Sequence, residues 1–285
     1  MSDICIVYDR VRWEEKCLCE KAIKLGHTSK MIDAKTLAIS TFDGNTSHNF
    51  GDIVLQRCIS HYRGLYLTAC LEFLGSNVIN AYSTAEICGN KLLTSVYLSR
   101  HRIPTPVTQF AFGPDVAGEV GDEMGYPLVL KPIVGSWGRM IIPIKDKDVM
   151  DSIIEMREEM SNPLNKIYYL QDYVNRPPRD IRTIVVDDRV VTAIYRYSPE
   201  GEWRTNISRG GKAELCPITN ELEDICMKTS KAVGSGILGI DLMEDKEKGL
   251  VVHEVNNTVE FKGASTVSEK DIAAEIVNYA SKMAM

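Results

Sequence analysis

Long hydrophobic runs are missing from this sequence of 285 residues. No apolar stretch approaches the roughly 20 residues that a helix needs to span a bilayer, so we expect no membrane-spanning segment. The first ten residues, MSDICIVYDR, include Asp3 and Asp9 and predict a first strand rather than a signal peptide. We therefore expect a cytoplasmic protein that does not act at a membrane.

Paired-cysteine motifs are also missing. None of the eight cysteines forms a CxxC pair, so neither a zinc knuckle nor a disulfide framework is indicated. Most of these cysteines lie in apolar surroundings, which is typical of reduced thiols in a cytosolic protein. Their positions are 5, 17, 19, 58, 70, 88, 216 and 226.

The sequence also has no excess of basic residues. The 33 Lys and Arg against 39 Asp and Glu give a net charge of −6, so no basic field for nucleic acid is expected. Hydrophobic residues make up 44% and charged residues 25%, which is ordinary for a soluble globular protein. The length allows about two or three subdomains, and no internal repeat or low-complexity segment is evident.

The first part of the chain alternates strands and helices. Short apolar runs predict strands at 4–8 and 52–57, and helical spacing predicts helices at 13–25 and 62–75, the second ending at a glycine. This order predicts a small parallel α/β sheet.

The rest of the chain is richer in strands. A helix is expected at 83–102, and strands dominate from 106 to 197. A helix at 220–234 leads into a hairpin, and a last helix is expected at 271–284. The joint between the two halves should lie between residues 102 and 127.

The hairpin, ILGIDLMEDKEKGLVVHEVNNTVEFKG at 237–263, carries a candidate metal site. Asp241 precedes the polar turn and Glu254 follows it, so strand pairing can bring the two carboxylates together. Glu254 and Asn256 are two residues apart and share one face of a strand. Two carboxylates and an amide oxygen suit Mg²⁺ that also holds a nucleotide phosphate. The alternative is a surface hairpin with solvated acids.

A lysine and a glycine-rich loop suggest a phosphate site. Lys131 ends the predicted strand 127–132, and GSWGR at 135–139 joins it to the next strand. Gly135 and Gly138 allow backbone N–H groups to turn toward an anion, and Arg139 adds charge. The loop is neither a dinucleotide-binding nor a Walker motif. A lysine at a strand end and an ordinary turn are the alternatives.

Two further segments could contact a nucleotide. The strand 168–174 exposes an end that could hold an adenine, although a plain strand and loop is the alternative. Cations repeat along the following segment and could bind a triphosphate and carboxylates, or they could form a solvated charged face. They are Arg182, Arg196, Arg204, Arg209 and Lys212, with a Gly210-Gly211 turn.

The order of these pieces resembles the ATP-grasp superfamily. The segments DIR, EWRTNISRGGKA and EVNNTVEF are similar to those of its RimK branch, and within that branch the chain resembles the LysX and ArgX ligases that act on the carrier protein LysW. This resemblance implies an α/β (α+β) ATP-grasp fold. An N-terminal parallel α/β domain would cover residues 1–88 and an ATP-grasp domain 89–285, with a central subdomain at about 105–173 and a C-terminal one at about 174–285.

The resemblance also implies roles for individual residues. Mg²⁺ would be bound by Asp241, Glu254 and Asn256, and Arg204 and Lys131 would act in catalysis. The amino-acid substrate would face Arg196, Asn256, Asn257, Thr258, Gly263 and Ala264. ATP would be bound by Lys91, Lys131, Gly135, Ser136, Trp137, Gly138, Arg139, Gln171, Asp172, Tyr173, Val174, Asp180, Arg182 and Asn206.

The implied activity is an ATP-dependent carboxylate–amine ligation in lysine or arginine biosynthesis. ATP and two Mg²⁺ ions would convert the γ-carboxyl of the C-terminal glutamate of LysW to an acyl phosphate, which the α-amino group of α-aminoadipate or glutamate attacks. A homo-oligomer is expected. The alternatives are a glutamate ligase for another protein tail or cofactor, and a non-catalytic ATP-binding regulatory module.

One segment departs from the family pattern. After the shared EFK, members for α-aminoadipate typically carry Asn-Ser or Asn-Thr, and members for glutamate carry Gly-Phe. This chain has Gly263-Ala264. The departure leaves open which acidic amino acid is used and admits an enzyme that accepts both.

Overall fold

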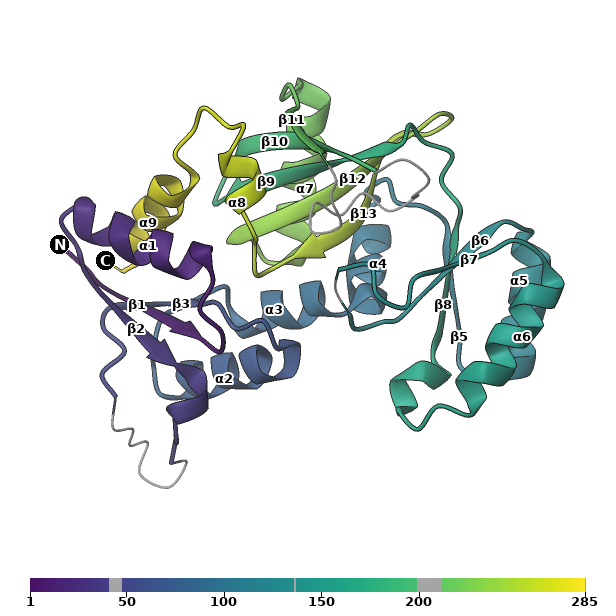
Figure 1. The fold of residues 1–285 in the computed structure, drawn as a ribbon, viewed down its shortest axis with the longest axis horizontal. Coiled ribbons are helices and arrows are strands. Elements are labelled where there is room, and N and C mark those ends of the chain that lie inside the picture. Colours follow the sequence, from purple (N-terminus) through teal and green to yellow (C-terminus); the bar gives the residue numbers. More distant parts are fainter. Residues whose placement is uncertain (41–47, 136, 199–211, 285) are drawn as a thin grey trace.

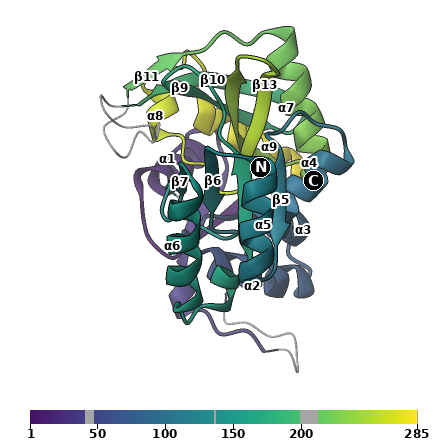
Figure 2. The same ribbon diagram turned by 90° about the vertical axis from the view of Figure 1, so that its right-hand side faces the viewer.

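Strands of the computed structural model form three sheets, within the residues that it describes: 1–40, 48–135, 137–198 and 212–284. Two of the sheets have four strands and one has five. The sheets follow one another in space from an N-terminal lobe, through the C-terminal sheet, to a small lobe that projects to one side (Figures 1 and 2). The predicted α/β class is confirmed.

The N-terminal sheet is parallel, with strand order β2-β1-β3-β4. Alternate residues of β1 enter different cores because successive side chains point to opposite faces. Ile4 and Ile6 pack with helices α1 and α9, whereas Cys5 and Val7 pack on the other face, with Leu71 of α2. Figure 1 shows α1 and α9 together on one side of this sheet and α2 on the other. The elements are β1 (Asp3–Tyr8), α1 (Trp13–Lys24), β2 (Thr28–Asp33), β3 (Ile53–Gln56), α2 (His61–Phe73), β4 (Val78–Ile79) and α9 (Ile272–Met283).

Two helices link this lobe to the rest of the chain, where the sequence predicted one at 83–102. That prediction is wrong, because α3 (Tyr82–Gly89) ends and α4 (Lys91–Arg100) begins at Asn90. Asn90 has an extended backbone, and its side chain accepts hydrogen bonds from the N–H groups of Leu92 and Leu93. This is an N-cap, which satisfies donors that the helix start leaves without partners.

The small lobe is a sheet with order β5-β8-β6-β7, covered on one face by two helices that the sequence did not predict. Helix α5 includes two glycines, which weaken helical propensity, and α6 is an amphipathic helix capped by Asp146. The elements are β5 (Thr108–Ala111), α5 (Pro114–Met124), β6 (Leu128–Lys131), β7 (Ile142–Ile144), α6 (Lys147–Glu158) and β8 (Tyr168–Asp172).

The C-terminal sheet is antiparallel, with order β11-β10-β9-β12-β13. Leu222 and Val233 of α7 pack against Val185 and Leu238 on one face. The predicted helix 220–234 and the predicted hairpin are thereby confirmed. The elements are β9 (Arg179–Val186), β10 (Arg189–Tyr197), β11 (Lys212–Leu215), α7 (Asn220–Val233), β12 (Ile237–Asp245), β13 (Gly249–Asn256) and α8 (Lys262–Ser265).

All eight cysteines are free. Among the described residues, no helix is long and apolar enough to cross a membrane.

Candidate functional site

Strand pairing brings the predicted metal-binding carboxylates together. Asp241 on β12 lies opposite Glu254 on β13, and Gly239 lies opposite Asn256. The register then shifts, because Leu242 pairs with Val252 and His253 has no partner across the ladder. Asp241, Glu254 and Asn256 all line one cavity of about 600 Å³.

Asp241 is held by two arginines from neighbouring strands. Arg182, directly opposite on β9, forms a two-pronged ion pair with the Asp241 carboxylate, with Nη2 2.8 Å from Oδ2. Arg196 Nη2 on β10 lies 3.1 Å from the same oxygen. Burial opposes ionisation of Asp241, but the two cations outweigh it and hold its pKa below the usual range. The carboxylate is therefore ionised at neutral pH.

A second carboxylate, Asp180, fixes Arg196. Arg196 Nε and Nη2 each lie 2.7 Å from an Asp180 oxygen, and both side chains are buried. Burial opposes the charge of Arg196, but Asp180 and Asp241 raise its pKa above the ordinary value. Asp180 thus orients a cation at the cavity wall.

Lys91 connects Glu254 to the glycine-rich loop. Its Nζ lies 3.0 Å from Glu254 Oε1 and 2.8 Å from the carbonyl oxygen of Gly135. Burial raises the pKa of Glu254, but the charge of Lys91 outweighs this effect and the net shift is downward. Lys91 is the first residue of α4, so the cap at Asn90 also sets its position.

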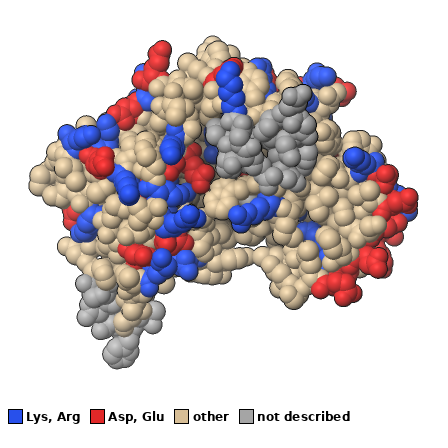
Figure 3. Space-filling view, viewed as in Figure 1, with Lys and Arg blue, Asp and Glu red and all other residues tan. Residues whose placement is uncertain are grey.

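Basic side chains gather across the middle of the molecule, around a hollow in which acidic atoms are visible (Figure 3). The cavity lies between the N-terminal lobe and the C-terminal sheet. The predicted site residues that line it are Lys91, Gly135, Trp137, Gly138, Arg182, Arg196, Asp241, Glu254, Asn256, Asn257, Thr258, Gly263 and Ala264.

Lys131 lies on the face of the small sheet that turns away from α5 and α6. Its Nζ lies 2.6 Å from Gln171 Oε1, and burial lowers its pKa to about 8. Gln171 in turn donates to Thr108 Oγ1 and to Tyr169 OH, both at 2.9 Å. Tyr169 OH is 2.8 Å from Ser95 Oγ of α4, which joins this face to the linking helices.

Other predicted nucleotide contacts lie outside the cavity wall. Arg139 is exposed, with its guanidinium 5.1 Å from the centre of the Trp137 ring. Asp172 is half-buried, Tyr173 is exposed, and Val174 is half-buried. Ser136, Arg204, Asn206, Arg209, Gly210 and Gly211 lie outside the described residues.

The donor set fits Mg²⁺. Hard carboxylate and amide oxygens are the ligands that this ion prefers, and the Asn256 amide nitrogen is directed to the carbonyl oxygen of Gly239, 3.4 Å away. The described part of the chain has no group of three or more His, Cys, Asp and Glu side chains that could hold a metal. Any ion here would rely on Asp241, Glu254 and the amide.

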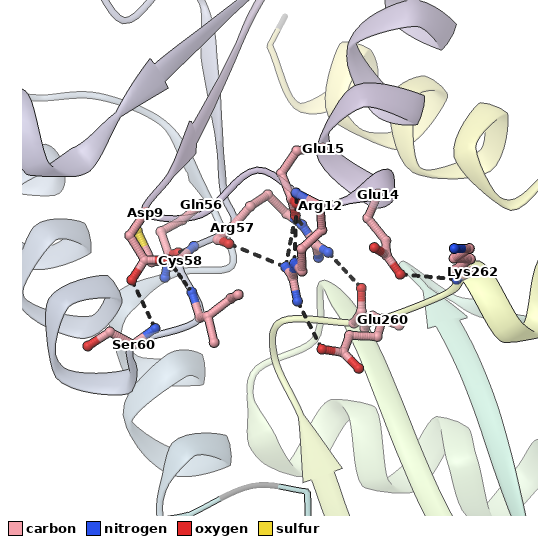
Figure 4. Close-up of polar contacts among 12 residues, drawn as sticks. Asp9, Arg12, Glu14, Glu15, Gln56, Arg57, Cys58, Ser60, Glu260 and Lys262 are labelled. Carbon is pink, nitrogen blue, oxygen red and sulfur yellow. Dashed lines mark hydrogen bonds and ion pairs between the residues drawn. The ribbon is translucent and has the colours of Figure 1, made fainter. Parts of the chain in front are cut away.

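The sequence did not indicate that the N-terminal lobe forms one wall of the cavity. Arg12 bridges the lobes, with Nη2 2.8 Å from Glu15 and Nη1 3.0 Å from Glu260, which follows the hairpin. Arg57 Nε lies 3.2 Å from Glu15 (Figure 4). Its Nη2 donates to the Val259 carbonyl at 2.8 Å. The only sequence feature related to this contact between the lobes is the position of Arg57 at the end of a predicted strand.

Glu14 and His253 are further residues that sequence reasoning missed. Glu14 is 5% exposed, lines the cavity and accepts from the backbone N–H of Lys262. His253 is the residue inserted by the register shift, and neither of its buried ring nitrogens has a hydrogen-bond partner in the described structure. Burial, followed by the charge of Lys131, lowers the pKa of His253 to about 3, so the ring is neutral at pH 7.

Two family models cover the chain almost from end to end. A LysX preATP-grasp domain matches residues 4–87, and a RimK-like ATP-grasp domain matches residues 88–280. The chain is 39% identical over 271 residues to the alpha-aminoadipate–LysW ligase LysX of Saccharolobus solfataricus, covering 95% of this chain and 98% of that one. It is 35% identical over 276 residues to the glutamate–LysW ligase ArgX of Sulfolobus acidocaldarius, covering 97% of each.

Solved structures show the same fold. A RimK domain ATP-grasp protein from Sphaerobacter thermophilus superposes with a TM-score of 0.79 at 22% identity, over 98% of this chain and 99% of that one. The ATP-grasp ligase PsnB, solved with a phosphomimetic variant of its minimal precursor, Mg and ADP, superposes with a TM-score of 0.76 at 18% identity, over 99% and 98%.

Proposed function

Because the chain belongs to the RimK-like ATP-grasp family, we propose that it ligates an acidic amino acid to a carrier protein at the expense of ATP. The acceptor is the γ-carboxyl of the C-terminal glutamate of LysW, and the amine is the α-amino group of α-aminoadipate or glutamate. The observation that carries this proposal is the pairing of Asp241 with Glu254 at a cavity wall that also presents Lys91 and Arg196. The named activities of relatives that match over nearly the whole chain support the substrates, and with them a role in lysine or arginine biosynthesis.

The chemistry requires an activated carboxylate, because a free carboxylate is a poor electrophile. An oxygen of the carrier carboxylate attacks the γ-phosphorus of ATP, which gives an acyl phosphate and ADP. The α-amino group, as the free base, then attacks the acyl carbon. Phosphate leaves, the amine loses a proton, and an isopeptide bond forms.

In this reaction, the residues of this chain would supply positive charge to the phosphates and hold the reactants in position. Lys91 and Lys131 supply cations for phosphate oxygens, and the backbone N–H groups of the glycine-rich loop add donors. Arg182 and Arg196 keep Asp241 ionised. Two Mg²⁺ ions, held by Asp241, Glu254 and Asn256, would neutralise negative charge on the phosphates.

The remaining predicted residues complete the site. Arg204 would assist phosphoryl transfer and Asn206 would lie near the nucleotide. The other ATP contacts would come from Gly135–Ile141 and Gln171–Arg182. Arg196, Asn256–Thr258, Gly263 and Ala264 would face the amino acid, and the domain division at residue 88 would place the ATP-binding elements in 89–285.

A reconstituted assay tests the proposal. The purified protein is incubated with ATP, Mg²⁺, LysW and either α-aminoadipate or glutamate, while ADP release and the mass of the carrier are followed. We expect ADP release that depends on both carrier and amino acid, and a carrier mass increased by one amino-acid residue. If ADP is released with an acidic amino acid and another acceptor but not with LysW, the protein is instead a glutamate ligase that acts on a different acceptor. ATP binding without ADP release under any condition would identify a regulatory module.

The proposal also includes a cytoplasmic location and a homo-oligomeric state. Light scattering of the purified protein measures the second directly, and a monomer at micromolar concentration would contradict it.

A further inference from the structure

One part of the cavity, the arm, lies against the N-terminal lobe. It is lined by the end of β3, the start of α2 and the end of α3. Its apolar sides come from Leu65, Ala85 and Cys88, and its polar groups come from Gln56 and His61.

Gln56 presents an unsatisfied donor in this arm. The backbone N–H of Cys58 donates to Gln56 Oε1 at 2.5 Å (Figure 4). A backbone N–H can only donate, so the amide oxygen must face it and the NH₂ group must face the other way. Gln56 is 6% exposed and lines the cavity, and within the described residues its Nε2 has no hydrogen-bond partner. Because Gln56 lines the cavity, this NH₂ group is available to donate to a ligand bound there.

Two glycines provide the room for these polar side chains. A Cβ atom at Gly64 of α2 would lie 2.5 Å from Gln56 Nε2, and a Cβ at Gly89 of α3 would lie 2.0 Å from His61 Cε1. Neither glycine has a positive φ, so the backbone does not require glycine there. Glycine destabilises a helix relative to alanine. Gly64 lies inside α2 and has this cost, whereas Gly89 ends α3; a side chain at either position would collide with Gln56 or His61.

His61, which lines the same cavity, supplies a second, uncharged donor. Burial, followed by the charge of Lys91, lowers the pKa of its imidazole, so the ring is neutral at pH 7 and carries one N–H. The ring abuts Gly89, two residues before the Lys91 that pairs with Glu254. The arm therefore opens beside the proposed phosphate and metal site.

We propose that this arm binds a spectator carboxylate, one that is not activated, at the end of a short aliphatic chain, with Gln56 and His61 as its donors. The inference rests on the proposed function, in which both substrates carry such a group: the side-chain carboxylate of the free amino acid and the terminal α-carboxylate of the carrier. Neutral donors with apolar sides suit a carboxylate on methylene groups better than a triphosphate, which requires cations. Gln56 and His61 are thus specificity-determining residues.

The substitution Gln56→Glu tests this assignment. It keeps the size of the side chain and an oxygen for Cys58 N–H, but it replaces the NH₂ donor by a negatively charged acceptor. We expect KM to rise at least about tenfold for the substrate whose carboxylate occupies the arm, the loss expected when a hydrogen bond to a charged group is removed, with KM for ATP unchanged. A rise for the amino acid or for the carrier identifies which of the two supplies the carboxylate.

Two further variants complete the experiment. Gln109→Glu adds the same charge on β5, outside the cavity, and should leave all three KM values unchanged. His61→Phe keeps the ring but removes its N–H, so it should raise the same KM as Gln56→Glu even if Gln56→Glu lowers the melting temperature. Unchanged KM values for both carboxylate substrates in Gln56→Glu and His61→Phe would overturn the assignment.

Calorimetry separates this inference from the proposed function. If wild-type protein forms no LysW conjugate, the proposed function fails. Titration of the amino acids and the carrier into wild type and Gln56→Glu still measures the affinity of each ligand for the arm. Weaker binding of one acidic ligand to the variant supports the inference, and equal binding of both ligands to the two proteins refutes it.

Discussion

At the scale of single residues, each carboxylate of the candidate metal site is paired with a cation from a different element. Asp241 pairs with Arg182 of β9, and Glu254 pairs with Lys91 of α4. These cations keep both acids ionised despite burial. The site is therefore ready to bind a divalent ion without a change in protonation.

The substitution Glu254→Gln tests the role of one of these charges. It keeps the shape of the side chain but removes a negative oxygen, so we expect turnover to fall by at least about two orders of magnitude. The measurement is the rate of ADP release at saturating substrates, with a melting curve to verify folding. Glu247→Gln, in the exposed turn of the same hairpin, is the control and should retain normal turnover. Near-normal turnover in Glu254→Gln would exclude Glu254 from catalysis.

Lys131 predicts a pH dependence for nucleotide binding. Burial lowers its pKa from 10.5 to about 8, so its charge is present below pH 8 and is lost as the pH rises through that value. If Lys131 binds phosphate, ATP affinity should be constant below about pH 7 and should fall between pH 7 and 9. Lys131→Arg remains charged throughout this range, and its affinity should stay flat.

A substitution can remove the charge of Lys131 at neutral pH. Lys131→Ala should weaken ATP binding by about 1.5–3 kcal/mol, the range for a hydrogen bond to a charged group. Isothermal titration with a non-hydrolysable ATP analogue measures both effects. Unchanged affinity in Lys131→Ala, or identical pH profiles for wild type and Lys131→Arg, would assign Lys131 a purely structural role.

At the scale of elements, the best-predicted parts were those determined by neighbouring residues. The hairpin 237–256 followed from two apolar runs and a polar turn, and its pairing of Asp241 with Glu254 is as expected. The register shift at His253 was not predictable, because a bulge leaves no mark in the alternation of polar and apolar residues. Asn90 is the one local signal for the division of helix 83–102, because asparagine favours N-cap positions.

The short helix α8 leads to a prediction about amino-acid specificity. Gly263 and Ala264 line the cavity, and Ala264 is only 3% exposed, so a larger side chain there would enter the cavity or the core beside Phe261. α-Aminoadipate exceeds glutamate by one methylene, a difference of ~1–3 kcal/mol in a pocket that measures chain length. With small residues at both positions, the enzyme should accept both amino acids and modestly prefer α-aminoadipate.

Ala264→Phe should shift this preference toward glutamate by filling the space of the longer chain. The comparison is kcat/KM for each amino acid in wild type and variant, with Ala264→Ser as a control that adds little volume. Melting curves detect any loss of stability from the larger side chain. A wild type that uses glutamate alone would contradict the prediction.

At the scale of the whole molecule, the sequence predicted the fold class and the hairpin but not the contacts between lobes. The cavity wall formed by Gln56, Cys58 and His61 depends on how the N-terminal sheet packs against the loop after β13. Arg57 and Val259 are 202 residues apart along the chain, yet they share a hydrogen bond. No local pattern reports such a pairing, because it results from the packing of complete elements.

The same contact leads to a prediction about stability. Arg57 is buried between the lobes, where it is bonded to Glu15 (Figure 4) and to the Val259 carbonyl. Arg57→Met keeps most of the apolar stem but leaves a buried carbonyl without its charged donor and Glu15 with Arg12 as its remaining cation. We expect the free energy of unfolding to fall by about 2–4 kcal/mol.

The matched control is Arg189→Met. Arg189 pairs with Glu275 and also connects the C-terminal sheet to α9, but this pair is exposed. Its loss should cost less than about 1 kcal/mol, because solvent already screens the two charges. Urea denaturation of wild type and both variants gives the comparison. If Arg57→Met is no less stable than Arg189→Met, the buried network does not hold the two lobes together, and the N-terminal wall of the cavity must be fixed instead by the apolar packing of α1 and α9.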